Sequence, residues 1–406
     1  MKKIHLLNTI ILAMAFVFTI SSCKKDEEEI NPVNNSITPE LESYISGIYD
    51  DYIADYPEFP GGYAIHVITP DDEGYAQKGI DPEFTDEYHF RAQSTTKTFT
   101  ATGIMILHQR GLLDIKNLII DTIPGKNIPY IPATPSFDIP YKNQIAIWQL
   151  LSHRAGVYDI KNYPVNGEMY VESFLEGNPN YTFSYSDIIG VIAENQLSLF
   201  EPGEMWGYSN EGYVMLAQII ERVSGKTYKQ FMMDEIVIPL GLSNTSFVCE
   251  GTEQTLPVPF VEAWLYSQEI QYKSTEENMS ANVGEGNMIT STKDLSKFYR
   301  LLLQGEAGVN LVNVNKFMKD CRPIAELSTV GYGAALFHFE GLGYGHGGDG
   351  SGISVRCYTD PDNDFTVLVL LNCWNFYNGP EDQSIFVSQS NLLEEMMYTL
   401  KTKFTE

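Results

Sequence analysis

Apolar residues recur at helical spacing near both ends of the chain. Just inside each of these helical patterns, apolar residues alternate with polar ones. After Thr38 and Pro39, typical residues of a helix start, five apolar side chains fall on one helical face: Leu41, Tyr44, Ile45, Ile48 and Tyr52. The same spacing predicts a final helix over 388–400. Alternation predicts strands over 63–69 and up to 79, and again over 331–339, 342–347, 352–358 and 365–371.

The middle of the chain has a different pattern. A largely apolar helix is expected from Ser94 to Gln109, ending at Gly111. Proline-rich loops then separate helical patterns at 145–152, 186–197, 212–224 and 228–238, and a capped helix follows over 291–303.

This order of elements predicts an α+β sandwich, with one antiparallel sheet flanked by helices. Residues 39–111 and 286–406 would form the sandwich, and 112–285 an all-helical insertion within the same catalytic domain. A cleft is expected between the two parts.

The N-terminus indicates export. Two lysines precede an apolar run that is too short to span a bilayer and typical of a signal peptide, here 1–22. Small residues before Cys23 resemble the bacterial lipoprotein box, which implies lipidation of Cys23, an acidic tether over 23–38 and a location in the bacterial cell envelope. The alternative is an ordinary cleavage site with a stray cysteine.

Charge and cysteine content exclude some partners and cofactors. A net charge of −27 argues against nucleic acid, because phosphate binding needs clustered lysine and arginine. The four other cysteines, Cys249, Cys321, Cys357 and Cys373, lack zinc-site spacing, and we expect free buried thiols. We expect no metal or cofactor, a membrane contact through the lipid anchor only, and a small-molecule or peptide substrate. The sequence does not fix the oligomeric state; a monomer is the simplest expectation.

Ser94 and Lys97 form the first candidate catalytic pair. Three residues apart on a helix, they share one face, where an ammonium group can activate a hydroxyl. The spacing alone is weak, since Ser21 and Lys24 repeat it inside the leader.

Tyr208 and Asn210 form the second candidate pair. The phenol could serve as a base if Lys97 stabilised its anion, and the Asn210 amide could hold a substrate carbonyl. The same spacing occurs at Tyr141 and Asn143, but without the preceding glycine turn that would direct it into a cleft.

The third candidate is the glycine-rich stretch 345–352, which contains His346, Gly347, Gly348 and Asp349. A strand edge without side chains can pair with a substrate and direct N–H groups at a developing oxyanion. His346 would line this wall, whereas we expect His153 to be structural.

The three candidates together resemble the three motifs of the serine β-lactamase-related family: Ser94-x-x-Lys97, Tyr208-x-Asn210 and His346-Gly347-Gly348. Other runs of the chain, such as 150–156 and 286–295, also resemble sequences of that family. The resemblance covers about residues 40–400. It implies an acyl-enzyme mechanism in which Ser94 attacks a carbonyl, Lys97 and Tyr208 move the proton, and Asn210 orients the substrate. It further implies an oxyanion hole built from the N–H groups of Ser94 and Asp349.

Two departures from the family's patterns bear on the reaction and the substrate. The second motif has Tyr208 where class A β-lactamases have serine, so the resemblance implies no separate glutamate base. Where β-lactamases usually have Lys-Thr-Gly, this chain has His346-Gly347-Gly348, so two groups that bind a substrate carboxylate are missing. This favours an esterase or a D-Ala-D-Ala carboxypeptidase-like enzyme, acting on an ester or a peptide or cell-wall-related amide, over a true β-lactamase. The motifs of α/β-hydrolases and zinc hydrolases do not occur. The rival hypothesis is a surface-tethered binding protein of the same fold that has lost its activity.

Overall fold

The computed structural model describes residues 37–81, 83–379 and 382–405. The expected signal peptide and Cys23 lie outside the described residues, as does the expected tether up to residue 36. Ile37 is buried and Thr38 already begins a helix, so the tether ends before Ile37. None of the described helices combines the length and apolar character that a membrane span needs.

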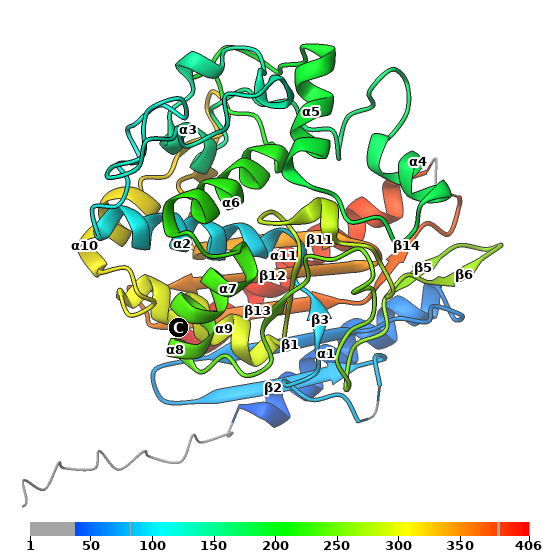
Figure 1. Cartoon of the computed structure of the whole chain (residues 1–406). Helices are drawn as coiled ribbons and strands as arrows, with labels where there is room; N and C mark the ends of the chain where they lie inside the picture. Colours follow the sequence, from blue (N-terminus) through cyan, green and yellow to red (C-terminus); the bar gives the residue numbers. More distant parts are fainter. Residues whose placement is uncertain (1–36, 82, 380–381, 406) are drawn as a thin grey trace, which may run out of the picture. The chain divides into compact units, whose positions relative to one another are not determined.

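An eight-stranded antiparallel sheet organises the described chain (Figure 1). Near one edge of this sheet, β1 pairs with β13, so strands far apart in the sequence lie side by side, with Tyr63 opposite Leu371. The strands, in order across the sheet, are β2 (Glu73–Lys78), β1 (Tyr63–Ile68), β13 (Phe365–Leu371), β12 (Ile353–Asp360), β11 (Gly343–Gly350), β10 (Phe337–Phe339), β9 (Gly331–Tyr332) and β8 (Arg322–Pro323).

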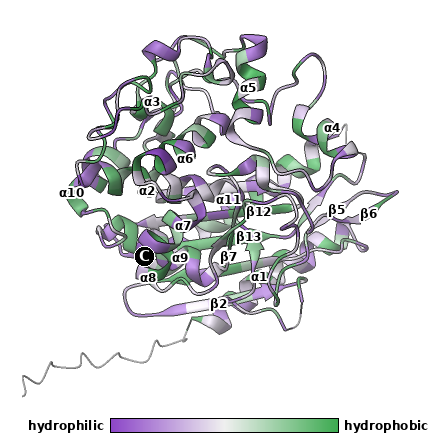
Figure 2. Cartoon of the chain, viewed as in Figure 1, coloured by the Kyte–Doolittle hydropathy of each residue, from purple (hydrophilic) through white to green (hydrophobic). Residues whose placement is uncertain are grey.

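Both faces of this sheet are apolar and both are covered by helices. Successive residues of a strand point to opposite faces, and Figure 2 shows β13 as predominantly hydrophobic. Val367 and Val369 pack in one core with residues of α1 (Thr38–Asp55) and α11 (Ser384–Thr405). Leu368 and Leu370 belong to a second core, with residues of α2 (Thr96–Gln109) and α9 (Thr292–Gln304). The predicted class, an antiparallel sheet flanked by helices, is therefore confirmed.

The expected all-helical insertion is mostly but not entirely helical. Its helices are α3 (Ile147–Leu151), α4 (Tyr170–Gly177), α5 (Tyr185–Asn195), α6 (Asn210–Ser224), α7 (Tyr228–Met232) and α8 (Ile238–Leu240). It also contributes β4 (Ser246–Phe247), which shares a small sheet with β3 (Phe90–Arg91) and β7 (Met288–Thr290). A hairpin of β5 (Trp264–Tyr266) and β6 (Gln271–Lys273) lies beside β14 (Cys373–Asn375). Strands of two or three residues are too short to show alternation in a sequence.

Several predicted boundaries agree with the structure and one strand does not. The Ser291 hydroxyl caps α9 by accepting from the N–H of Asp294 at 3.2 Å, and α6 ends at Gly225, whose φ is 78°. The strand expected over 331–339 is split into β9 and β10, because a turn closes between Gly333 and Leu336. Short helical segments complete the described chain: α10 (Leu311–Asn313) and turns at Gln93–Thr95, Pro135–Phe137, Lys142–Gln144, Met233–Val237, Ser280–Asn282 and Val314–Met318.

Candidate active site

Ser94 lies in a tight helical turn, Gln93–Thr95, that leads directly into α2. Gln93 has a φ of 49°, a conformation that costs free energy for a residue with a side chain. Thr96 holds the turn in place, since its hydroxyl donates to the Gln93 carbonyl at 2.7 Å and accepts from the Met288 N–H at 3.2 Å. Ser94 is thereby half-exposed on a fixed backbone.

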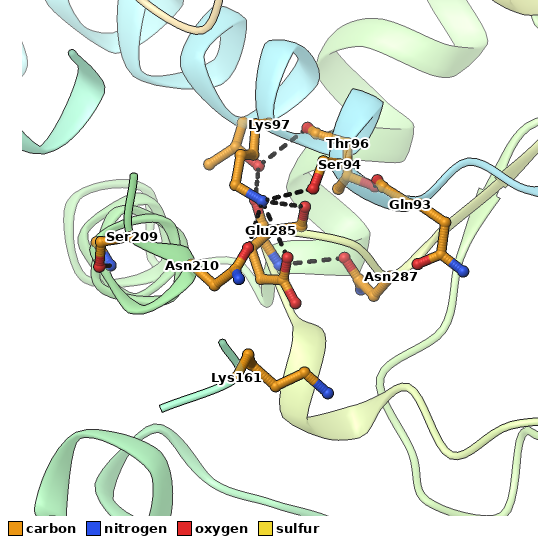
Figure 3. A network of polar contacts seen from close by, with 12 residues as sticks. Gln93, Ser94, Thr96, Lys97, Lys161, Ser209, Asn210, Glu285 and Asn287 are labelled. Carbon is orange, nitrogen blue, oxygen red and sulfur yellow. Dashed lines mark hydrogen bonds and ion pairs between the residues drawn. The ribbon is translucent and has the colours of Figure 1, made fainter. Parts of the chain in front are cut away.

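Lys97 is fully buried one turn further along α2. Its Nζ lies 3.0 Å from Ser94 Oγ, 2.7 Å from Asn210 Oδ1, and 2.9 and 3.0 Å from the carbonyl oxygen and Oε2 of Glu285 (Figure 3). Its pKa is raised, because the nearby Tyr208 and Glu285 oxygens outweigh the burial that opposes its charge. The structure therefore presents an ammonium group to the Ser94 hydroxyl.

Asn210, the first residue of α6, is held by a buried carboxylate that the sequence did not single out. The Asn210 Nδ2 lies 3.2 Å from both carboxylate oxygens of Asp159, and its backbone N–H donates to Asp159 at 3.3 Å. This fixes the side chain with its oxygen toward Lys97. The amide nitrogen has two hydrogens, so one can bond Asp159 while the other is available to a substrate carbonyl.

Tyr208 lies beside Lys97 and is fixed by His153. The His153 ring lies 4.2 Å from the Tyr208 ring, and its Nδ1 accepts from the N–H of Ser209 at 3.1 Å, a structural role as expected. The Lys97 Nζ is 4.9 Å from the centre of the Tyr208 ring. Burial raises the pKa of the Tyr208 hydroxyl by more than Lys97 and hydrogen bonding lower it. This direction of the shift in pKa favours the neutral phenol, and the role of Tyr208 in proton transfer stays a prediction.

The glycine-rich stretch forms β11, which is an interior strand for part of its length. Only Gly343–Gly345 pair with β10, so on that side the segment 346–350 has no strand partner among the described residues. It lies against the Ser94 turn instead. A Cβ at Gly348 would come within 2.4 Å of the Ala92 carbonyl oxygen and 3.2 Å of the Ser94 nitrogen. Glycine at 348 is what allows this close approach.

His346 and Asp349 are both engaged within the protein. The His346 Nδ1–H donates to the Gly347 carbonyl at 2.5 Å, and Nε2 accepts from the Tyr332 hydroxyl at 3.1 Å. Burial lowers the pKa of His346 to about 3, so the ring is neutral. The Asp349 carboxylate accepts from the Ser354 hydroxyl at 2.7 Å and from Arg356 at 3.0 Å.

A cleft of about 640 Å³ lies in front of these groups. Among the residues that line it are six expected ones, namely Ser94, Tyr208, Asn210, His346, Gly347 and Asp349; Lys97 and Gly348 lie directly behind. Cys23 is outside the described residues. His66, Glu73 and Asp86 place possible metal-ligand atoms within 4.8 Å of one another, but none of them lines the cleft.

Sequence reasoning missed seven charged residues of this site: Asp159, Lys161, Glu172, Glu277, Glu285, Arg356 and Glu394. Asp159 is buried behind Asn210, and the other six line the cleft. For Glu285 the sequence signal was a single charge in the run Val283-Gly284-Glu285-Gly286, which is otherwise uncharged. The four cysteines expected to be free buried thiols form no disulfide, but only Cys357 and Cys373 are buried, whereas Cys249 and Cys321 are partly exposed.

Comparisons with known proteins agree with this arrangement. The family model described as Beta-lactamase matches residues 49–387. Penicillin-binding protein 4* of Bacillus subtilis (strain 168) is 27% identical over 57% of this chain, and the match spans 49%, about half, of that relative. A solved D-stereospecific amidohydrolase from Streptomyces sp. is 26% identical, with a TM-score of 0.68 over 84% of this chain and 94% of its own. D-amino acid amidase from Ochrobactrum anthropi SV3 shares the fold at 22% identity and a TM-score of 0.68, covering 90% of this chain and 98% of its own.

Proposed function

The chain belongs to the beta-lactamase family, and from this premise we propose that it is a serine hydrolase that acts through an acyl-enzyme. Ser94 is the nucleophile, and Lys97 and Tyr208 move its proton to the leaving group. The substrate is an ester or an amide, of a peptide or cell-wall-related compound. No metal or cofactor takes part.

The proposed reaction has two halves. The Ser94 oxygen attacks the substrate carbonyl as its proton passes to the Lys97–Tyr208 pair, and the carbonyl oxygen becomes an oxyanion facing the N–H groups of Ser94 and Asp349. The Tyr208 hydroxyl gives a proton to the leaving group as the carbonyl–leaving-group bond breaks, and the Ser94 proton replaces it. Water then attacks the acyl-enzyme, and one of its protons passes through the same groups to the Ser94 oxygen as the acyl–oxygen bond breaks.

The contact that best supports this proposal is the one made by Lys97. Its Nζ reaches both Ser94 at 3.0 Å and Asn210 at 2.7 Å, although 113 residues separate Lys97 from Asn210. A buried ammonium next to a half-exposed hydroxyl, facing a cleft, is costly to maintain for structural reasons alone. It suits a site that has to activate an alcohol.

Two observations bear on the choice of substrate. The Streptomyces relative is named a D-stereospecific amidohydrolase, and the third motif here lacks the lysine and the hydroxyl that would bind a carboxylate. We therefore place amides and esters ahead of β-lactams. Esters, D-amino acid amides and a β-lactam are compared in the experiment below.

The deciding experiment is labelling of Ser94. The purified protein is treated with a fluorescent fluorophosphonate and then assayed against p-nitrophenyl esters, D-amino acid p-nitroanilides and a chromogenic β-lactam. We expect labelling and turnover in the wild type, loss of both in Ser94→Ala, and labelling in Ser351→Ala, a second serine on the cleft wall. A wild type that shows neither would support the rival hypothesis, a binding protein without activity.

We also propose that the protein is held in the bacterial cell envelope by a lipid on Cys23. The support is the order of residues before Cys23 in the sequence. We propose no other membrane contact, and a monomeric state.

A further inference from the structure

Three of the four oxygens that the Lys97 Nζ contacts can only accept hydrogen bonds, and the fourth is the Ser94 hydroxyl oxygen at 3.0 Å. An ammonium group has three hydrogens, and Asn210 Oδ1, the Glu285 carbonyl oxygen and Glu285 Oε2 lie within 3.0 Å to receive them. An ammonium in this setting has no lone pair with which to take the Ser94 proton. Before Lys97 can act as a base, it must pass on one of its own protons.

Glu285 is placed to receive that proton. Its Oε2 lies 3.0 Å from the Lys97 Nζ, and the exposed fractions of the two side chains are 0% for Lys97 and 5% for Glu285. The contact is a buried ion pair. Protonation of Glu285 removes one buried negative charge, so the loss of attraction to Lys97 is offset by lower desolvation of the carboxylate.

Two more features make Glu285 suitable as a proton acceptor. Its backbone carbonyl oxygen also accepts a hydrogen bond from Lys97 at 2.9 Å, so Glu285 stays in place whether its carboxyl group is ionised or protonated. Its second oxygen, Oε1, is buried and has no hydrogen-bond partner among the described residues. The carboxylate is therefore not stabilised by donors other than Lys97.

We infer that Glu285 accepts a proton from Lys97 as Ser94 attacks the substrate, an inference that rests on the proposed serine-hydrolase function. The Ser94 O–H bond breaks as the bond from its oxygen to the substrate carbon forms, and this proton goes to Nζ. One N–H proton of Lys97 passes at the same time to Glu285 Oε2, which becomes a neutral acid. When the leaving group departs with the Tyr208 proton, Lys97 replaces that proton and Glu285 returns one to Lys97.

Other titratable groups face this pair and shape its pH dependence. Those that interact with Glu285 electrostatically are Lys97, Tyr208, Lys161, Glu211 and Tyr228. Burial and Asp159 hold the pKa of Glu211 well above its usual range, so Glu211 is a poor anion. Lys161, on the other side of the Glu285 side chain in Figure 3, is the second cation of the group.

The test measures the rate of Ser94 acylation by p-nitrophenyl acetate, followed as a burst in a stopped-flow instrument across a range of pH. We expect Glu285→Gln to slow the burst at neutral pH on the order of 100-fold, with substrate affinity little changed. Its rate should then rise with pH, because a buried Lys97 without an anion loses its proton unaided. Glu285→Asp, which keeps the carboxylate, should recover part of the rate and keep the pH dependence of the wild type.

Glu235→Gln is the matched control. Glu235 lies 3.0 Å from the Lys226 Nζ but does not line the cleft, so its variant should acylate like the wild type. A Glu285→Gln variant as fast as the wild type at neutral pH would overturn the inference. So would one slowed by the same factor at every pH, which would indicate a role in positioning alone. A wild type with neither a burst nor steady-state turnover would instead overturn the proposed function, and the inference with it; if turnover occurs without a burst, kcat/KM reports acylation in its place. Circular dichroism establishes that each variant is folded.

Discussion

Gly348 offers a direct way to disturb the site without removing any chemical group. Substitution with alanine adds one methyl group that points at the backbone of the Ser94 turn. That methyl carbon would lie 2.4 Å from the Ala92 carbonyl oxygen, whereas ordinary contact begins at 3.4 Å, a deficit of 1.0 Å. The Ala92 oxygen and the Ser94 nitrogen, which the methyl group would meet, are backbone atoms, so either β11 or the Ser94 turn must move.

The expected effect follows from this displacement. A shift of about 1 Å between a nucleophile and its substrate costs on the order of 100-fold in rate, and the added methyl also crowds the Ser94 nitrogen at 3.2 Å. Overpacking of this kind lowers the free energy of unfolding by about 1–3 kcal/mol. We therefore expect Gly348→Ala to lose activity by far more than stability alone explains.

Two other glycines serve as controls for the assay of kcat/KM and Tm. At Gly347 the added methyl group would meet the flexible side chain of Arg356 at 2.9 Å, so a smaller loss is expected. At Gly47, inside α1, nothing lies within 4 Å, and alanine should stabilise the helix by about 1 kcal/mol without affecting activity. A Gly348→Ala enzyme with wild-type kcat/KM and Tm would show that β11 does not lie against the Ser94 turn in solution.

Lys97→Met and Tyr208→Phe should each lower kcat by several powers of ten with little change in the circular dichroism spectrum, and near-normal kcat in either would contradict the proton transfers proposed here. His346 has a pKa of about 3 in the folded protein, against 6.5 for an ordinary histidine. Between these two pH values only the unfolded chain binds a proton at this residue. The free energy of unfolding should therefore be retained above pH 6.5 and fall below pH 6.5 by about 1.4 kcal/mol per pH unit. Urea titrations near neutral and mildly acidic pH check this, and His346→Asn should show a shallower dependence than the wild type. Metabolic labelling with a fatty acid should mark the wild type and not Cys23→Ser; an unlabelled wild type would contradict lipidation.

Long, regular patterns in the sequence predicted the fold well. The strand expected over 365–371 is β13 to the residue, because a strand buried on both faces is apolar throughout. Helices α6 and α9 were predicted from their caps and apolar faces. Strands β4, β5 and β6 were not, because their partners lie far away in sequence and their lengths leave no period to detect.

The candidate site was predictable where a residue type carries a chemical signature at fixed spacing. Ser94, Lys97 and Asn210 lie together in the structure within 3.0 Å contacts. Glu285 and Asp159 have no such spacing: they meet Lys97 and Asn210 across 188 and 51 residues respectively. The protonated state of Tyr208 also depends on burial, which only the folded chain determines.

The pairing of β1 with β13 delays the completion of the candidate site during synthesis. Tyr63 leaves the ribosome long before Leu371, its partner in the sheet, so the main sheet stays incomplete until Leu371 has been made. Ser94 and Lys97 are made early, but the wall beside them, β11, is made only after the segment 112–285. A chain that stalls before β11 therefore lacks one wall of the candidate site, and under the proposed function it would have no turnover.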